Sequence, residues 1–427
     1  MTSNATVASL PASYSHQFSL AADGSRTLGA LLLGALVFLP HFPLRVNVDE
    51  HFGTVDFQLI LRLGLCAACG LYGLAHLPLA LDKLGRFPLA WMAILGVWAT
   101  VTAPFAANMF QATAACGVLW CVLLFVPAVV TQLGVTRSLQ TILLASVFYL
   151  VGQWALYFTV PELGRGEELL PGGEIIYRVG ADSQQLGLEA TALIGILLVL
   201  RRQRRISSNW FWLLLALAVV TLIGAKSRTS AIAAIAGVAF LGLRRLGSRQ
   251  VAKLGAIAAA SAVVLLILVA TDTISVDLDS AAASVSRSGT SQEITSVTGR
   301  ATIWEFVLLK ITESPVIGWG YCCASAASQD FEHHLRHAHN EILNAALCLG
   351  IVGAVLLVGM FLQQIIAACT TRDELPIFVT VVTLIAGITE PVLLISMPPV
   401  LMILWIMILS RATVESPSNN TPNTPCG

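Results

Sequence analysis

Three arginines and one histidine motif are the residues of this chain whose types and spacing could do chemistry. Arg228 and Arg300 lie among small residues, Arg178 lies in Tyr177-Arg178-Val179-Gly180, and each of the three is next to an apolar segment. A guanidinium group binds phosphate oxygens through two parallel hydrogen bonds. The histidine motif is His337-Ala338-His339-Asn340, and a neutral imidazole can take the proton of a hydroxyl group. Together these groups could bind a phosphate and activate an acceptor hydroxyl.

The position of His339 favours it as the base. Asn340 predicts the N-cap of a helix, so that His339 precedes the positive end of a helix dipole, where the charged ring is disfavoured. Alternatively, His339 has a structural role alone and caps its own helix. His-x-His also occurs in metal sites, but alternate residues at a helix start are expected to diverge and no third ligand is implied. We therefore predict no metal and no other cofactor.

Membrane-spanning helices must position these residues. Of the 427 residues, 56% are hydrophobic and only 11% are charged, whereas soluble domains carry about 25% charged residues. The net charge of zero gives no field that would recruit nucleic acid. Apolar blocks long enough to cross a bilayer as helices number twelve, at 27–44, 55–76, 88–103, 109–131, 139–160, 183–200, 209–225, 229–244, 252–270, 340–368, 374–390 and 394–410.

The distribution of basic residues predicts which side of the membrane each loop occupies. With the N-terminus in the cytoplasm, fourteen Lys and Arg residues lie inside and five lie in the short outer loops, as the positive-inside rule favours. The predicted order is a cytoplasmic leader at 1–26, nine helices within 27–270, a large outer loop at 271–339, three helices within 340–410 and a cytoplasmic tail at 411–427. A second outer loop spans 161–182.

Two further features of this arrangement concern the outer face. Within the large loop, Trp304, Val307, Leu308 and Ile311 recur at helical spacing and predict an amphipathic helix over 301–312. All three arginines then lie on the outer side, where basic residues need an explanation. They could contact lipid headgroups or pair with carboxylates, or they could bind substrate.

Charged residues within the spans are few. Arg62 and Glu189 lie inside predicted spans, and Glu390 ends the eleventh. Glu189 could pair with a basic residue or tune the site, and we assign no firm role to Arg62 or Glu390. Should His339 not be the base, Glu189 and Glu390 are the next candidates for removing the proton.

Several short motifs follow one another in a characteristic order. They are Ser227-Arg228-Thr229-Ser230, Gly299-Arg300-x-x-x-Trp304, Pro315-x-x-Gly318-x-Gly320, His337-x-His339-Asn340-x-x-Leu343 and Leu349-Gly350-x-x-Gly353. In this order, with the largest outer loop between the ninth and tenth spans, the chain resembles the O-antigen ligase and Wzy-type polysaccharide polymerase superfamily. The exopolysaccharide polymerases are the most similar branch. Upstream, Arg178-x-Gly180 followed by Gln185 departs from the family pattern, which has Asn where this chain has Gln.

The resemblance implies a fold and an activity. The fold is all-α, polytopic and GT-C-like, in the inner membrane. The donor is a glycan on undecaprenyl pyrophosphate, and the acceptor is a sugar hydroxyl on a glycan or a lipid-linked glycan. Family membership implies catalytic roles for His339, Arg300 and Arg228, with no metal. It implies substrate binding by Arg178, Arg228, Arg300, Trp304 and Asn340.

Polymerisation of an exopolysaccharide or O-antigen repeat is the preferred function, and ligation of O-antigen to lipid A core is the alternative. Export or chain-length proteins are possible partners, besides membrane lipid. A transporter or lipid-glycan flippase is the rival from another class, and a non-catalytic assembly protein is a third. A transporter should place its charges at the bilayer midplane, whereas the candidate charges here lie on one face.

Overall fold

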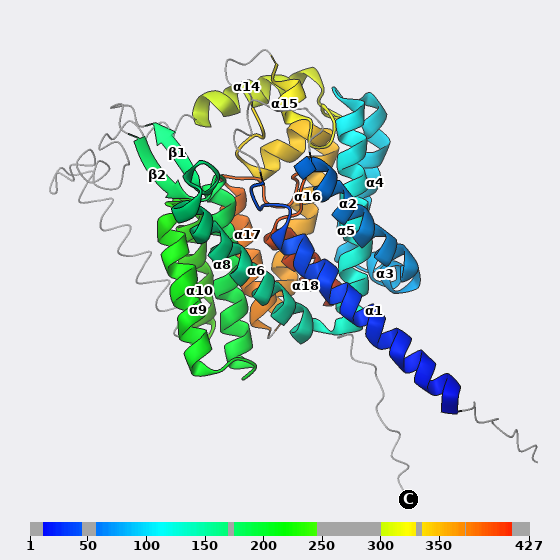
Figure 1. The fold of residues 1–427 in the computed structure, drawn as a ribbon. Helices are drawn as coiled ribbons and strands as arrows, with labels where there is room; N and C mark the ends of the chain where they lie inside the picture. Colours follow the sequence, from blue (N-terminus) through cyan, green and yellow to red (C-terminus); the bar gives the residue numbers. More distant parts are fainter. Residues whose placement is uncertain are drawn as a thin grey trace, which may run out of the picture.

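The computed structural model describes residues 12–44, 57–169, 175–245, 300–329, 335–371 and 373–411, and only the backbone of 12–22, 168–169, 244–245 and 300–301. Most of this part of the chain is helical (Figure 1). Its elements are α1 Ala12–Phe38, α2 Phe57–Ala75, α3 Leu77–Leu84, α4 Leu89–Thr102, η1 Ala103–Phe105, α5 Met109–Leu133, α6 Val135–Thr159, α7 Pro161–Gly164, β1 Arg165–Leu169, β2 Ile175–Val179, α8 Ser183–Arg202, α9 Ser208–Gly224, α10 Arg228–Arg245, α14 Arg300–Glu313, α15 Ala324–Ala327, α16 Glu341–Thr370, α17 Glu374–Gly387 and α18 Val400–Arg411.

Six described helices are long and apolar enough to cross a membrane, namely α2, α5, α6, α8, α9 and α16. The pair α3 and α4, bent by 101° at its break, would make a seventh, while α10, α17 and α18 are apolar but shorter. The predicted class, a polytopic helical membrane protein, agrees with this set. The predicted number of twelve spans is not confirmed. The ninth span, at 252–270, lies outside the described residues, as do residues 271–299 and 330–334 of the outer loop between spans nine and ten.

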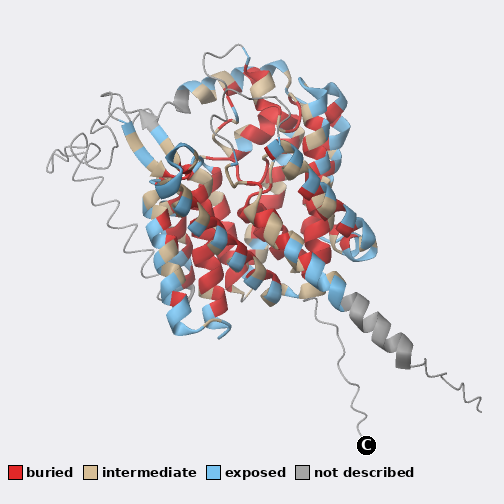
Figure 2. Cartoon of the chain, in the orientation of Figure 1, coloured by how far each residue is buried: buried red, intermediate tan, exposed pale blue. Residues whose placement is uncertain are grey.

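The core lies along α5, α8, α16 and α18 (Figure 2). Every residue of α18 from Val400 to Ser410 is buried. By contrast, α9 exposes Trp212, Leu213 and Ile223. An apolar surface of this kind does not persist in water, so α9 is expected to face lipid.

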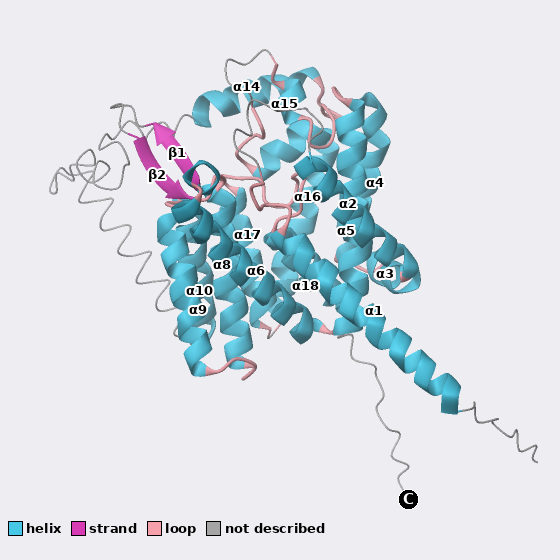
Figure 3. Ribbon diagram, in the orientation of Figure 1, coloured by secondary structure: helices cyan, strands magenta, loops and turns pink. Residues whose placement is uncertain are grey.

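The bundle has two chemically different ends. At one end, Arg202 pairs with Glu374, and Arg411 pairs with Asp373 at 2.7 Å. At the other end, Asn340 donates to the Ile388 carbonyl at 3.0 Å, and the Thr389 hydroxyl donates to Thr229 at 2.8 Å. The starts of α8, α10 and α16 and the end of α17 therefore lie together, beside α14 and the β1–β2 hairpin (Figures 1 and 3).

Two predicted segments differ from the structure. The loop at 161–182 contains α7 and an antiparallel hairpin in which Arg165 lies opposite Val179. The predicted last span, 394–410, begins only at Val400, because residues 388–399 form a loop, of which 390–394 are buried. Buried apolar residues of that loop, such as Val392 and Leu393, have the composition of a span without the helix.

Helix α14 confirms the predicted helix in the large loop, but its buried face is partly different. Val307 is buried as expected, whereas Leu308 is 53% exposed. Lys310, which is not part of the apolar stripe, is buried as well; its Nζ lies 3.0 Å from Glu313 and 5.2 Å from the centroid of the Trp319 ring. An ion pair and an aromatic face compensate for the burial of the ammonium group.

The glycine motifs hold α14 and α16 together. Gly350 has a φ of 69°, which breaks α16, and glycine adopts this conformation without steric cost. Near the break, the backbone N–H groups of Trp319 and Gly320 donate to the carbonyls of Leu347 and Cys348, both at 2.9 Å. A Cβ on Gly318 would lie 2.5 Å from the backbone of Cys348. The motif glycines are thus explained by backbone packing, which fixes the segment after α14 against α16.

Candidate functional site

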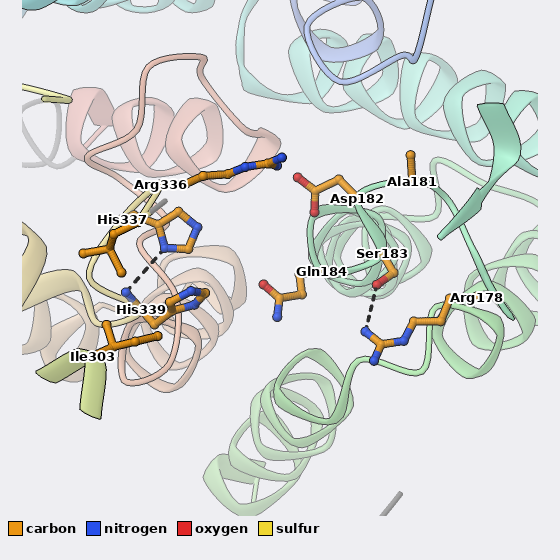
Figure 4. A pocket seen from close by; sticks show the side chains of 10 residues that line it. Arg178, Ala181, Asp182, Ser183, Gln184, Ile303, Arg336, His337 and His339 are labelled. Carbon is orange, nitrogen blue, oxygen red and sulfur yellow. Dashed lines mark hydrogen bonds between the residues drawn. The ribbon is translucent and has the colours of Figure 1, made fainter. Parts of the chain in front are cut away.

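A polar cavity of about 410 Å³ opens at the end of the bundle where α8 and α16 begin (Figure 4). One wall is the start of α8 and the residues before it, and the other is the segment that leads into α16. Its lining is charged or polar for the most part, and consists of Arg178, Ala181, Asp182, Ser183, Gln184, Ile303, Leu335, Arg336, His337 and His339. Two residues of the predicted site, Arg178 and His339, face each other across this space.

A buried carboxylate orients the predicted base. The Nδ1 atom of His339 lies 3.1 and 3.2 Å from the two carboxylate oxygens of Glu390, whose side chain is buried. Because a carboxylate only accepts hydrogen bonds, this contact assigns the ring proton to Nδ1 and leaves the lone pair on Nε2. A Glu–His pair of this kind also stabilises the positive ring that forms when Nε2 takes a proton.

The second histidine of the motif contacts the same carboxylate. His337 Nε2 lies 3.7 Å from Glu390, and the two imidazole rings meet edge to face with centroids 4.3 Å apart. The expectation that the two histidines diverge is therefore wrong. The physical reason is the backbone of His339, whose φ of 49° is uncommon for a residue with a side chain and often marks functional sites.

The start of α16 holds Glu390 in place. Asn340 donates to the Ile388 carbonyl, and Asn344 donates to the Leu394 carbonyl, both at 3.0 Å. The buried carboxylate of Glu341 accepts from three successive backbone N–H groups, those of Val392, Leu393 and Leu394. The loop that carries Glu390 is thus anchored on both sides of that residue, and its shape depends on α16.

Two residues predicted to bind substrate make bonds that shape the histidine segment. The Trp304 indole N–H donates to the Ala338 carbonyl at 3.1 Å. The Asn340 side chain accepts from the backbone of Ile342 and Leu343, both at 3.0 Å, which confirms the predicted N-cap. Contact of either residue with a substrate stays a prediction.

The arginines are distributed around the cavity. Arg178 lines it and donates to the Ser183 hydroxyl at 3.3 Å. Arg228 begins α10, between two residues, Ser227 and Thr229, that line a smaller neighbouring hollow with Glu390. Arg300 begins α14, and its side chain lies outside what the structure describes. The convergence of all three on one substrate stays a prediction.

Sequence reasoning missed Arg336 and the contact that Glu390 makes. Arg336 lies on the same wall as the histidines (Figure 4), and its position directly before the motif gave no signal. Glu390 was considered only as the charge that ends the eleventh span and as an alternative base, not as the partner of His339. A carboxylate followed by proline in such a place is a signal that could have identified it.

Asp182 adds a negative charge opposite Arg336 (Figure 4). Its carboxylate caps α8 by accepting from the Gln185 backbone at 3.1 Å. Desolvation at the cavity wall raises the pKa of Asp182 above its ordinary value; the bond from Gln185 opposes this shift, and the nearby charge of Glu390 adds to it. The cavity therefore combines two arginines with one carboxylate in its lining, while Glu390 lies behind the histidines.

The predicted lone charges in the spans have defined surroundings. Glu189 is buried in α8, where its partner is the Ser146 hydroxyl at 2.5 Å rather than a basic residue. Arg62 is half-buried in α2. Neither lines the cavity.

Comparison with known proteins bears on the same region. Residues 213–358 match the family model of the O-antigen ligase domain. The resemblance to the O-antigen ligase superfamily is confirmed. The matched residues include Arg228, Arg300, Trp304 and the histidine motif, while Arg178 and Glu390 lie outside the match. Comparison with curated proteins finds no match.

Proposed function

We propose that this chain transfers a glycan from a lipid-linked pyrophosphate to a hydroxyl group of an acceptor glycan. The observation that carries the proposal is the His339–Glu390 pair at the wall of a cavity that Arg178 and Arg336 also line. Such a transfer must neutralise a departing pyrophosphate and remove one proton from the acceptor. The cavity offers a group for each task.

The proposed reaction is a single displacement. The acceptor oxygen attacks the anomeric carbon of the donor sugar while the bond from that carbon to the pyrophosphate oxygen breaks. His339 Nε2 accepts the acceptor proton, and Glu390 stabilises the resulting imidazolium ring. The lipid pyrophosphate leaves with the electron pair, and the anomeric configuration inverts.

Arginine side chains bind the leaving group in this proposal. Arg178, Arg228 and Arg300 are the predicted donor ligands, and Arg336 joins them because it lines the cavity. Guanidinium groups bind phosphate oxygens bidentately and carry a charge that cannot be titrated away. A resident divalent metal is therefore not part of the proposed mechanism.

Within this function, polymerisation of an exopolysaccharide or O-antigen repeat is preferred, and ligation to lipid A core is the alternative. Both place the site at the outer face of the inner membrane, with undecaprenyl pyrophosphate as the lipid. A flippase is disfavoured because the arginines, histidines and carboxylates of the site gather at one end of the bundle, where α8 and α16 begin. Transporters place their binding groups near the bilayer midplane, typically on discontinuous helices.

Two assays test the proposal. The full chain, purified in bilayer discs, is incubated with a lipid-linked glycan donor after treatment with a chelator, and products are separated by chain length. Release of lipid pyrophosphate together with longer glycans supports a polymerase. In a deletion strain, a polymerase is indicated by single repeats that persist and a ligase by polymer left on its lipid carrier. Intact donor in the first assay, with normal glycans in the strain, contradicts the transferase.

A further inference from the structure

The histidine motif and Glu390 have the composition of a metal site as well as that of a base. Two imidazoles and one carboxylate place one ligand atom each within 4.8 Å of one another. Sites with two histidines, one glutamate and an open fourth position are typical of zinc. The cavity reaches both histidines, so the fourth position is accessible from solvent.

The distances fit zinc without a change of backbone. Zinc bonds of about 2.0–2.2 Å in a tetrahedron separate neighbouring ligand atoms by about 3.4 Å. Glu390 Oε2 lies 3.2 Å from His339 Nδ1 and 3.7 Å from His337 Nε2, and these two distances bracket the value for zinc. The two ligand nitrogens lie within 4.8 Å of each other, and rotation of the two partly exposed rings can adjust their separation.

We propose that His337, His339 and Glu390 bind one zinc ion, and that this ion blocks the transfer proposed above. When zinc binds His339 at Nδ1, the single proton of the neutral ring moves to Nε2. Nε2 then has no lone pair with which to accept a proton, so zinc binding and general-base catalysis exclude each other. The inhibitory half of this inference rests on the proposed function, whereas the binding half does not.

His337 undergoes the matching exchange. Its Nδ1 accepts a long hydrogen bond of 3.4 Å from the His339 backbone, which places the ring proton on Nε2 in the metal-free protein. Zinc at Nε2 moves that proton to Nδ1 and breaks this bond. The positive charge of Arg336 and the dipole at the start of α16 repel a cation here, whereas Asp182 and Glu390 attract it. The bonds from zinc to His337, His339 and Glu390 must therefore outweigh this repulsion.

The binding half is tested without any glycan. The full chain in bilayer discs is stripped with a chelator, dialysed and titrated with zinc sulfate by calorimetry, with cobalt as a spectroscopic probe of tetrahedral coordination. We expect one zinc per chain. His337→Gln and Glu390→Gln should each weaken binding by at least about tenfold, since loss of even an outer-shell partner costs about 10–100-fold in affinity. His76→Gln, which removes a histidine hydrogen-bonded to Ser25 and Tyr72 elsewhere in the fold, is the matched control and should bind zinc normally.

The inhibitory half uses turnover of the lipid-linked donor. Zinc should stop the wild-type chain, a chelator should restore it, and His337→Gln should remain active at the same zinc concentration. Absence of saturable zinc binding, or binding that neither variant weakens, overturns the site while leaving the transferase untouched. Zinc binding without loss of turnover overturns the inhibition. If no variant transfers glycan even without zinc, the proposed function fails and the binding result still stands.

Discussion

Replacing Glu390 with glutamine tests whether this buried carboxylate acts through His339. Glutamine keeps the size of the side chain and one oxygen acceptor, but it removes the negative charge that lies 3.1 Å from His339 Nδ1. The neutral ring can still be held in place. The imidazolium that forms during transfer, however, loses its counter-charge, so the transition state should suffer more than donor binding.

The size of the effect can be bracketed from the geometry. Two unit charges at 3.1 Å attract by about 5 kcal/mol at an effective dielectric constant of about 20, which is an upper limit because the ring spreads its charge. The lower limit is the difference between a charged and a neutral hydrogen bond, about 1–2 kcal/mol. An intermediate loss of about 2.7 kcal/mol corresponds to about 10²-fold in turnover.

The assay measures turnover and donor affinity for wild type, Glu390→Gln, His339→Ala and the double variant in matched amounts. Residues that act as one unit are not additive, so the double variant should be no slower than His339→Ala. Glu374→Gln is the control, because Glu374 is a buried, ion-paired carboxylate at the opposite end of α17. Turnover of Glu390→Gln within about threefold of wild type, or additive losses in the double variant, would refute the reasoning.

Three other predictions concern the arginines, Asp182 and the sidedness of the site. Arg228→Lys should lose most of its turnover, because a point charge does not replace a planar fork; near-normal kinetics would exclude Arg228 from donor binding. Asp182→Asn should keep the cap of α8, since asparagine also caps helices, and should remove the desolvation penalty that raises the pKa of Asp182. At a pH between the ordinary and the raised pKa of Asp182, the folded wild-type chain binds more protons than the unfolded wild-type chain does. The thermal stability of wild type should therefore fall, relative to Asp182→Asn, as pH rises through this window, and parallel pH profiles would contradict the assignment. A cysteine at exposed Glu167 in the hairpin should react with an impermeant reagent in intact spheroplasts, whereas native Cys369, exposed at the far end of α16, should react only after lysis; the reverse pattern would invert the predicted topology.

Helix positions were largely accessible from the sequence, because a helix in lipid must satisfy its own backbone and therefore appears as a long apolar block. The same rule failed at 394–399. There the backbone N–H and carbonyl of Leu394 pair with the side chains of Glu341 and Asn344, so that an apolar residue need not be helical. Lys310 illustrates a similar limit, since its burial depends on Glu313 and on the ring of Trp319, which follows after α14 has ended.

The candidate site was predictable only where its chemistry is local. His339 and the N-cap Asn340 are adjacent in the chain and gave a clear signal. Glu390 is separated from His339 by 51 residues, and their contact depends on how α16 anchors the loop after α17. The φ of 49° at His339 likewise has no sequence signature, and it is this turn that brings both rings to one carboxylate.

The most direct test of the proposed mechanism is turnover and donor affinity of His339→Ala beside His337→Ala, in matched membrane amounts with a lipid-linked glycan donor. Removal of a general base should lower turnover by about 10²–10⁴-fold while donor binding stays nearly intact. His337→Ala should have a mild effect, because His337 makes only the longer contact with Glu390. If His339→Ala turns over at a near-normal rate, or loses donor binding instead of rate, His339 is not the base.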